Sequence, residues 1–119
     1  MKILIVDDEP IIRLGLTVQA EEWGYEVLEA GDADEAILIL DKHSDIRLLL
    51  TDVDMPGSMD GVKLSHCVRE RWPPIHIIVV SGKLAIEQSR LPMGVRFFGK
   101  PFREELIQQT IRELISGGG

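Results

Sequence analysis

The sequence has a single cysteine, few aromatic residues, a deficit of basic residues and no long apolar segment. One cysteine, Cys67, excludes an internal disulfide and a zinc site built from cysteines. Thirteen Lys and Arg residues against twenty Asp and Glu residues give a formal net charge of −7, which disfavours charge-driven binding to nucleic acid or anionic lipid. No apolar run approaches the roughly 18 residues of a transmembrane helix, and the run at residues 3–6 is too short for the core of a signal peptide. We therefore expect a cytoplasmic protein that binds neither membranes nor nucleic acid directly.

The chain of 119 residues has the length of one domain, which we place at residues 1–119. A domain of this size buries about two-thirds of the surface of its unfolded chain, so it can form a core without disulfides. Ser116 and the three glycines after it predict a flexible tail at residues 116–119.

Short apolar runs alternate along the chain with segments of helical periodicity. We predict strands at residues 3–6, 25–30, 46–51, 75–80 and 95–98. Helical spacing of apolar residues predicts helices within residues 10–23, 33–40, 64–72 and 106–114, and residues 83–90 form a weakly patterned candidate for a short helix. Strict alternation of strand and helix is typical of an α/β fold in which helices cover both faces of a parallel sheet.

Acidic, hydroxyl and amine side chains follow four of the five predicted strands. Because ligands of open α/β sheets bind beyond the carboxyl ends of the strands, we expect these side chains to form one site. They are Asp7 and Asp8 after the first strand, Asp52 and Asp54 after the third, Ser81 after the fourth, and Lys100 after the fifth.

The chemistry of this set favours phosphoryl transfer. Asp7, Asp8 and Asp52 would repel one another without a cation, and carboxylates are the usual protein ligands of Mg²⁺. Lys100 and Ser81 supply a positive charge and a hydrogen-bond donor, as a phosphoryl group requires. A carboxylate can attack phosphorus to give an aspartyl phosphate. Asp52 is the predicted nucleophile because it ends the central apolar strand and begins a loop.

Five short motifs contain or flank these residues. They are Val6-Asp7-Asp8-Glu9, Thr51-Asp52-Val53-Asp54-Met55-Pro56, Asp60-Gly61, Val80-Ser81-Gly82 and Lys100-Pro101-Phe102. Each motif is common by itself, but together they resemble response-regulator receiver domains of two-component signalling, in particular the chemotaxis-regulator type, in the family's order and at nearly its spacing over almost the whole chain. The resemblance implies a flavodoxin-like (βα)5 three-layer sandwich with a five-stranded parallel sheet of order 2-1-3-4-5.

The resemblance also implies how the acids act. Asp52 would accept a phosphoryl group from a sensor histidine kinase or a histidine phosphotransfer protein. Asp7, Asp8, Asp52 and the backbone carbonyl of Asp54 would hold Mg²⁺ or Mn²⁺. Such a domain is a phosphoacceptor that catalyses only its own phosphorylation and dephosphorylation, and is not otherwise an enzyme.

The remaining implied roles concern the switch that phosphorylation operates. Ser81 and Lys100 would contact the phosphoryl group, and the peptide bond between Lys100 and Pro101 would be cis. Phe97 occupies the family's aromatic switch position, which moves inward when Ser81 is drawn to the phosphate. The switch would change a surface that binds an unknown output protein.

Three features depart from the family's usual pattern. The loop after Pro56 carries Gly57-Ser58-Met59, one residue more than the commonest form. The segment between Ser81 and Lys100 is short, so we expect its helix to be truncated or irregular. The switch aromatic is phenylalanine rather than tyrosine or histidine. Since the short segment belongs to the family's dimerisation surface, a monomer and a phosphorylation-dependent dimer both stay open. No effector domain follows, so we expect a stand-alone receiver or one excised from a larger protein.

Two other functions fit part of the pattern. Asp52-Val53-Asp54 has the D-x-D form of haloacid-dehalogenase-like phosphohydrolases, although in that class the motif follows the first strand. A receiver-like domain that binds partners without phosphate is the second alternative. Turnover of a phosphomonoester would indicate the first, and phosphate-independent binding the second.

Several of these residues also have plain structural interpretations when taken singly. Asp7 and Asp8 fit a solvated strand end, Ser81 a turn, and Lys100 a surface lysine. Phe97 fits a core aromatic residue equally well as a switch.

Overall fold

The computed structural model describes residues 1–82 and 90–117. Five strands form one parallel sheet in the order β2-β1-β3-β4-β5, as predicted. The strands are β1 (Lys2–Val6), β2 (Glu26–Ala30), β3 (Ile46–Asp52), β4 (His76–Ser81) and β5 (Arg96–Gly99). β1, β3 and β4 lie inside the sheet, so their carboxyl ends are neighbours.

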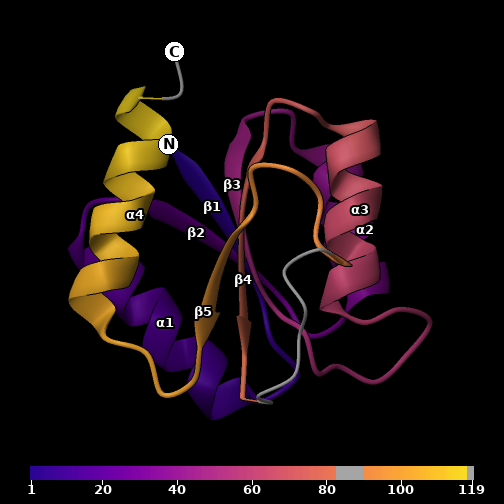
Figure 1. Cartoon of the computed structure of the whole chain (residues 1–119), viewed down its shortest axis with the longest axis horizontal. Coiled ribbons are helices and arrows are strands. Elements are labelled where there is room, and N and C mark those ends of the chain that lie inside the picture. The colour runs from indigo at the N-terminus through magenta and orange to yellow at the C-terminus, as the bar shows by residue number, and fades with distance from the viewer. Residues whose placement is uncertain (83–89, 118–119) are drawn as a thin grey trace.

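Two pairs of helices cover the two faces of the sheet (Figure 1). The described helices are α1 (Pro10–Glu22), α2 (Ala33–Lys42), α3 (Gly61–Arg71) and α4 (Glu104–Gly117). α1 and α4 pack on one face, and α2 and α3 pack on the other. The strand order and the three layers are those of a flavodoxin-like fold, which confirms the predicted fold class.

Alternation along the buried strands divides the core between the two faces. Leu4 and Val6 point towards α2 and α3, whereas Ile3 and Ile5 point towards α1 and α4. β3 and β4 contribute to both faces in the same way, so both read as continuous apolar runs.

Local signals fix where three of the helices begin. Pro10 is the first residue of α1. Asp32 caps α2 by accepting a hydrogen bond of 2.8 Å from the backbone N–H of Glu35. Asp60 caps α3 in the same way, at 2.9 Å from the N–H of Lys63. The loops that precede α2 and α3 follow β2 and β3, so both lie at the carboxyl edge of the sheet.

Predicted and observed boundaries differ by small amounts. Each strand differs from its predicted range by one residue at one or both ends. α4 includes Ser116 and Gly117, so the prediction of a tail from residue 116 ended this helix two residues too early. The short helix predicted at residues 83–90 falls almost entirely outside the described residues.

Candidate functional site

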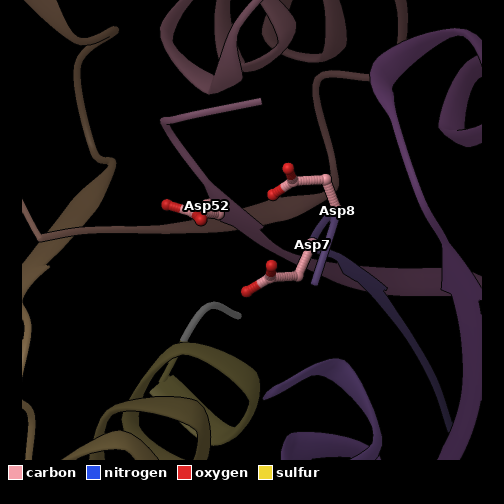
Figure 2. Close-up of side chains that lie close together, drawn as sticks. All are labelled: Asp7, Asp8 and Asp52. Atoms are coloured by element: carbon pink, nitrogen blue, oxygen red, sulfur yellow. The ribbon is translucent and has the colours of Figure 1, made fainter. Parts of the chain in front are cut away.

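Three carboxylates meet where β1 and β3 end (Figure 2). Asp7 and Asp8 follow β1, and Asp52 is the last residue of β3. One oxygen of each lies within 4.8 Å of the others. Asp7 and Asp52 are buried, at 1% and 4% exposure, whereas Asp8 is exposed. The sheet therefore concentrates negative charge at a point that solvent reaches from one side.

Lys100 is the basic residue of this cluster. Its Nζ lies 3.2 Å from Oδ2 of Asp52 and 3.8 Å from Oδ2 of Asp7. The backbone N–H of Lys100 donates a hydrogen bond of 2.8 Å to the carbonyl of Ser81, which fixes the start of the loop after β5 beside β4. The Lys100–Pro101 peptide bond is cis. One ammonium group thus faces two buried carboxylates.

The two oxygens of Asp52 have different neighbours. Oδ1 accepts a hydrogen bond of 3.3 Å from the backbone N–H of Asp54, and Oδ2 accepts the one from Lys100. These contacts hold the carboxylate beside those of Asp7 and Asp8 (Figure 2). A group approaching from solvent would therefore meet Asp52 between a lysine and the other acids.

Asp7 carries the clearest sign of an incomplete site. Its Oδ1 accepts a hydrogen bond of 2.9 Å from the N–H of Glu9, but its buried Oδ2 has no hydrogen-bond partner among the described residues. Burial raises the pKa of the Asp7 carboxyl, and the charge of Asp52 adds to this, although the Glu9 bond and Lys100 act the other way. A buried carboxylate oxygen without a donor needs another positive partner when it is ionised.

A hard divalent cation fits this donor set. Carboxylate oxygens from Asp7, Asp8 and Asp52 are close enough to share one ion, and oxygen is the ligand that Mg²⁺ prefers. The Oδ2 of Asp7, which accepts no hydrogen bond from the described residues, is an atom that such an ion would satisfy.

Ser81 lies next to the acids, at the end of β4. Its side chain is buried, and its Oγ donates a hydrogen bond of 3.3 Å to Oδ2 of Asp54. The hydroxyl predicted to contact a phosphoryl group is thus engaged with an acid of the neighbouring loop.

Phe97 lies apart from the acids. It pairs with Val79 across β4 and β5, is half-buried, and packs against the core formed with α2 and α3. Its ring therefore contributes to the core on that face of the sheet, and its switch role stays a prediction.

Arg13 is a residue of the site that the sequence analysis missed. Its Nη1 donates a hydrogen bond of 2.7 Å to the backbone carbonyl of Asp7, and its Nε donates one of 3.0 Å to Glu29. Arg13 ties the end of β1 to α1 and β2. The only signal in the sequence is a basic residue in the second turn of a helix that begins beside two acids.

The loop after Asp52 is attached to the first turn of α2. Ser58 donates a hydrogen bond of 2.6 Å to the side chain of Asp34 in the first turn of α2. Gly57 has φ +108°, a conformation that favours glycine. The turn at Gly57 and Ser58 is thus held against α2 by this hydrogen bond.

Comparisons with known proteins agree with this geometry. A family model described as the response regulator receiver domain matches residues 3–112. The chain is 37% identical over 114 residues to the sensor histidine kinase RcsC of Escherichia coli strain K12, covering 93% of this chain and 12% of that protein. It is 31% identical over 124 residues to a chemotaxis protein CheY homologue of Campylobacter jejuni strain 81-176, covering 99% of this chain and 95% of that protein. The chain spans a small part of the kinase and nearly all of the chemotaxis protein.

Solved structures give the same result. A response regulator receiver protein from Sinorhizobium medicae WSM419 superposes with a TM-score of 0.90 at 26% identity, covering 98% of this chain and 94% of that one. The receiver domain of the hybrid histidine kinase CckA gives 0.80 at 32% identity, with 95% and 97% covered. The response regulator TrrA of Thermotoga maritima, solved in complex with Mg²⁺ and BeF, gives 0.82 at 25% identity, with 95% and 97% covered. Because the family model covers most of its length and the chemotaxis protein is 31% identical over nearly the whole of both chains, this chain belongs to the response regulator receiver domain family.

Proposed function

We propose that Asp52 is the phosphoacceptor of this receiver domain, in a two-component pathway. The observation that carries the proposal is the placement of its carboxylate at the end of β3, with Lys100 3.2 Å from one oxygen and two further acids beside it. The phosphohydrolase alternative is disfavoured because the D-x-D sequence follows β3 rather than the first strand. No observation favours a receiver that acts without phosphate.

In the proposed reaction, a carboxylate oxygen of Asp52 attacks the phosphorus of a phosphohistidine. The new bond joins oxygen and phosphorus, the phosphorus–nitrogen bond breaks, and its electron pair returns to the imidazole of the donor. Lys100, which faces Asp52 and Asp7, balances the charge that the phosphoryl oxygens bring. Ser81 would exchange its bond to Asp54 for one to a phosphoryl oxygen, and this exchange would couple the site to the sheet and Phe97.

We further propose that Asp7, Asp8 and Asp52, with the backbone carbonyl of Asp54, bind Mg²⁺ or Mn²⁺. The bound cation would supply charge neutralisation at the phosphoryl oxygens. The buried oxygen of Asp7 that accepts no hydrogen bond from the described residues supports this assignment, as does the Mg²⁺ complex of the related TrrA protein.

The proposed donor is a sensor histidine kinase or a histidine phosphotransfer protein. Several relatives are receiver segments of sensor kinases, which supports a phosphohistidine as the source of the phosphoryl group. The output partner and the oligomeric state, monomer or phosphorylation-dependent dimer, stay predictions, as does a cytoplasmic location. No helix within residues 1–82 and 90–117 has the length and apolarity needed to cross a membrane.

The assignment of Asp52 is tested by trapping the acyl phosphate. The protein is incubated with acetyl phosphate and Mg²⁺ and then treated with borohydride, which reduces an aspartyl phosphate to homoserine with loss of phosphate. Peptide mapping by mass spectrometry should find homoserine at position 52 in the wild type and at no position in Asp52→Asn. Asp45→Asn, which changes an exposed acid at the opposite edge, is the matched control.

Homoserine at another aspartate, or an equal yield in Asp52→Asn, would contradict the assignment. Continuous release of phosphate from ordinary phosphomonoesters, without trapped product, would indicate the phosphohydrolase instead.

A further inference from the structure

The first residue of α3 lies directly against the phosphoacceptor's backbone. A Cβ atom built on Gly61 would come within 2.1 Å of the carbonyl oxygen of Asp52 and 2.7 Å of Cα of Val53. Real Cβ atoms essentially never approach other atoms closer than 3.0 Å. Both contacts are to backbone, which cannot move aside by a change of rotamer. Only glycine allows α3 and the end of β3 to approach this closely.

The backbone around Asp52 is held from two sides. The N–H of Val53 donates a hydrogen bond of 2.9 Å to the carbonyl of Val80 in β4, and the N–H of Gly61 donates one of 2.9 Å to the carbonyl of Val53. The hydroxyl of Thr51 donates a third, of 2.9 Å, to the carbonyl of Asp52. The peptide units that carry Asp52 are therefore fixed between β4 and the first turn of α3.

Helix propensity does not explain a glycine at this position. Glycine is a poorer helix former than alanine, and Gly61 has no positive φ that would require it. The close approach to Asp52 is what requires it. The contact thus links the helix start to the orientation of one side chain of the site.

We propose that Gly61 is a positioning residue for the phosphoacceptor, because its missing side chain lets α3 set the orientation of the Asp52 carboxylate. The inference rests on the proposed function of Asp52 and goes beyond it by assigning a role to a residue that touches no reacting atom. A methyl group at position 61 would rotate or shift the Asp52–Val53 peptide, and the carboxylate would move relative to Asp7 and Lys100. Displacements of about 1 Å at a reacting group can lower rates by around a hundredfold.

The test compares three alanine variants. Gly61→Ala introduces the clash. Val68→Ala removes buried volume from the same helix, seven residues and about 10 Å further along. Gly15→Ala adds a methyl group to a helical glycine of α1 that has nothing within 4 Å. The first two should both lower stability, but only Gly61→Ala should disturb the site.

Two quantities are measured under conditions in which circular dichroism shows each variant to be folded. The first is the rate of labelling by acetyl phosphate at a Mg²⁺ concentration that saturates that variant, followed by intact mass. The second is the Mg²⁺ affinity from isothermal titration calorimetry. Gly61→Ala should be labelled 10 to 100 times more slowly (about the range expected for a misplaced reacting group) and should bind Mg²⁺ more weakly. Val68→Ala and Gly15→Ala should stay within about twofold of the wild type.

Three outcomes would overturn the inference. A rate and an affinity for Gly61→Ala equal to those of the wild type would show that the contact does not position Asp52. Equal losses in Val68→Ala would show that loss of stability explains the effect. A Gly61→Ala protein that stays unfolded, also with a stabilising osmolyte, would assign Gly61 to the fold alone. If the wild type itself accepts no phosphoryl group, the proposed function fails, and the Mg²⁺ affinities still decide on Gly61.

Discussion

The two edges of the sheet use the same kinds of charged residue in opposite ways. At the amino edge, Lys2 contacts Asp45 at 2.8 Å and Arg71 contacts Asp41 at 2.9 Å, so each of these acids has its own base. At the carboxyl edge, one lysine faces the buried Asp7 and Asp52, with Asp8 beside them.

The acids at the two edges also differ in how far their side chains are exposed to solvent. The side chains of Asp45 and Asp41 are 59% and 48% exposed, whereas those of Asp7 and Asp52 are 1% and 5% exposed. The pKa of Asp45 is lowered by its hydrogen bond with Lys2, and that of Asp7 is raised by burial. At the amino edge, each of these acids is balanced by a basic side chain in the folded protein. At the carboxyl edge, one lysine faces two buried acids, so folding leaves negative charge that is not neutralised.

The comparison indicates where stability has been given up for function. Exposed pairs contribute little to stability and can be lost with little effect. Buried acids without sufficient positive charge destabilise the fold, so their presence in one cluster points to a ligand that supplies the missing charge. The following predictions test this difference between the two edges.

The largest effect is expected on cation binding. Asp8→Ala removes the exposed carboxylate of the cluster and should weaken Mg²⁺ binding at least about tenfold, because ligands of this ion are few and mostly carboxylates. Calorimetric titration measures the affinity. Asp45→Asn should bind Mg²⁺ as the wild type does, and an unchanged affinity in Asp8→Ala would remove this acid from the site.

A smaller effect is expected when the lysine of the cluster is removed. Lys100→Ala should still accept a phosphoryl group on Asp52, but the changes that phosphorylation causes at Ser81 and Phe97 should largely disappear. Amide chemical shifts of the phosphorylated protein measure those changes. If they persist in full, Lys100 does not couple the phosphoryl group to the sheet.

The smallest effect concerns stability in the absence of a cation. A carboxyl whose pKa is raised by folding destabilises the folded state above that pKa and ceases to do so as the pH falls below the unfolded value. Asp7→Asn should therefore raise the Tm at pH 7 without Mg²⁺ by a few degrees, and the gain should shrink towards pH 4. Thermal unfolding at the two pH values checks this. A lower Tm at pH 7, or a gain that does not depend on pH, would show that the charge of ionised Asp7 does not destabilise the folded protein.

Much of the fold and of the site can be predicted from the sequence, because the residues that follow each strand of a parallel sheet lie at the same edge. Alternating apolar runs predicted all five strands, and the rule for the carboxyl ends of parallel strands predicted that Asp7, Asp52 and Lys100 would meet. These predictions depend on local patterns and on one general rule of topology, which a single sequence can supply.

Other features depend on contacts between distant segments. Gly61 approaches the backbone carbonyl of Asp52, and Arg13 donates a hydrogen bond to the backbone carbonyl of Asp7. Every residue has a backbone carbonyl, so the residue types in the sequence do not indicate these contacts. The bond between Ser58 and Asp34 joins a loop to the first turn of α2, 24 residues away in the sequence. The end of α4 was misjudged for a different reason, since Gly117 is a poor helix former and yet is included in the last turn.

The most direct test of the account is the intact mass of the wild-type protein after incubation with acetyl phosphate, with Mg²⁺ or with a chelator. The account predicts one labile phosphoryl group per chain with Mg²⁺, little or none with the chelator, and none in Asp52→Asn under either condition. Labelling that is equal with and without Mg²⁺, or that persists in Asp52→Asn, would contradict the claim that the acids at the carboxyl edge form a cation-dependent phosphoacceptor site.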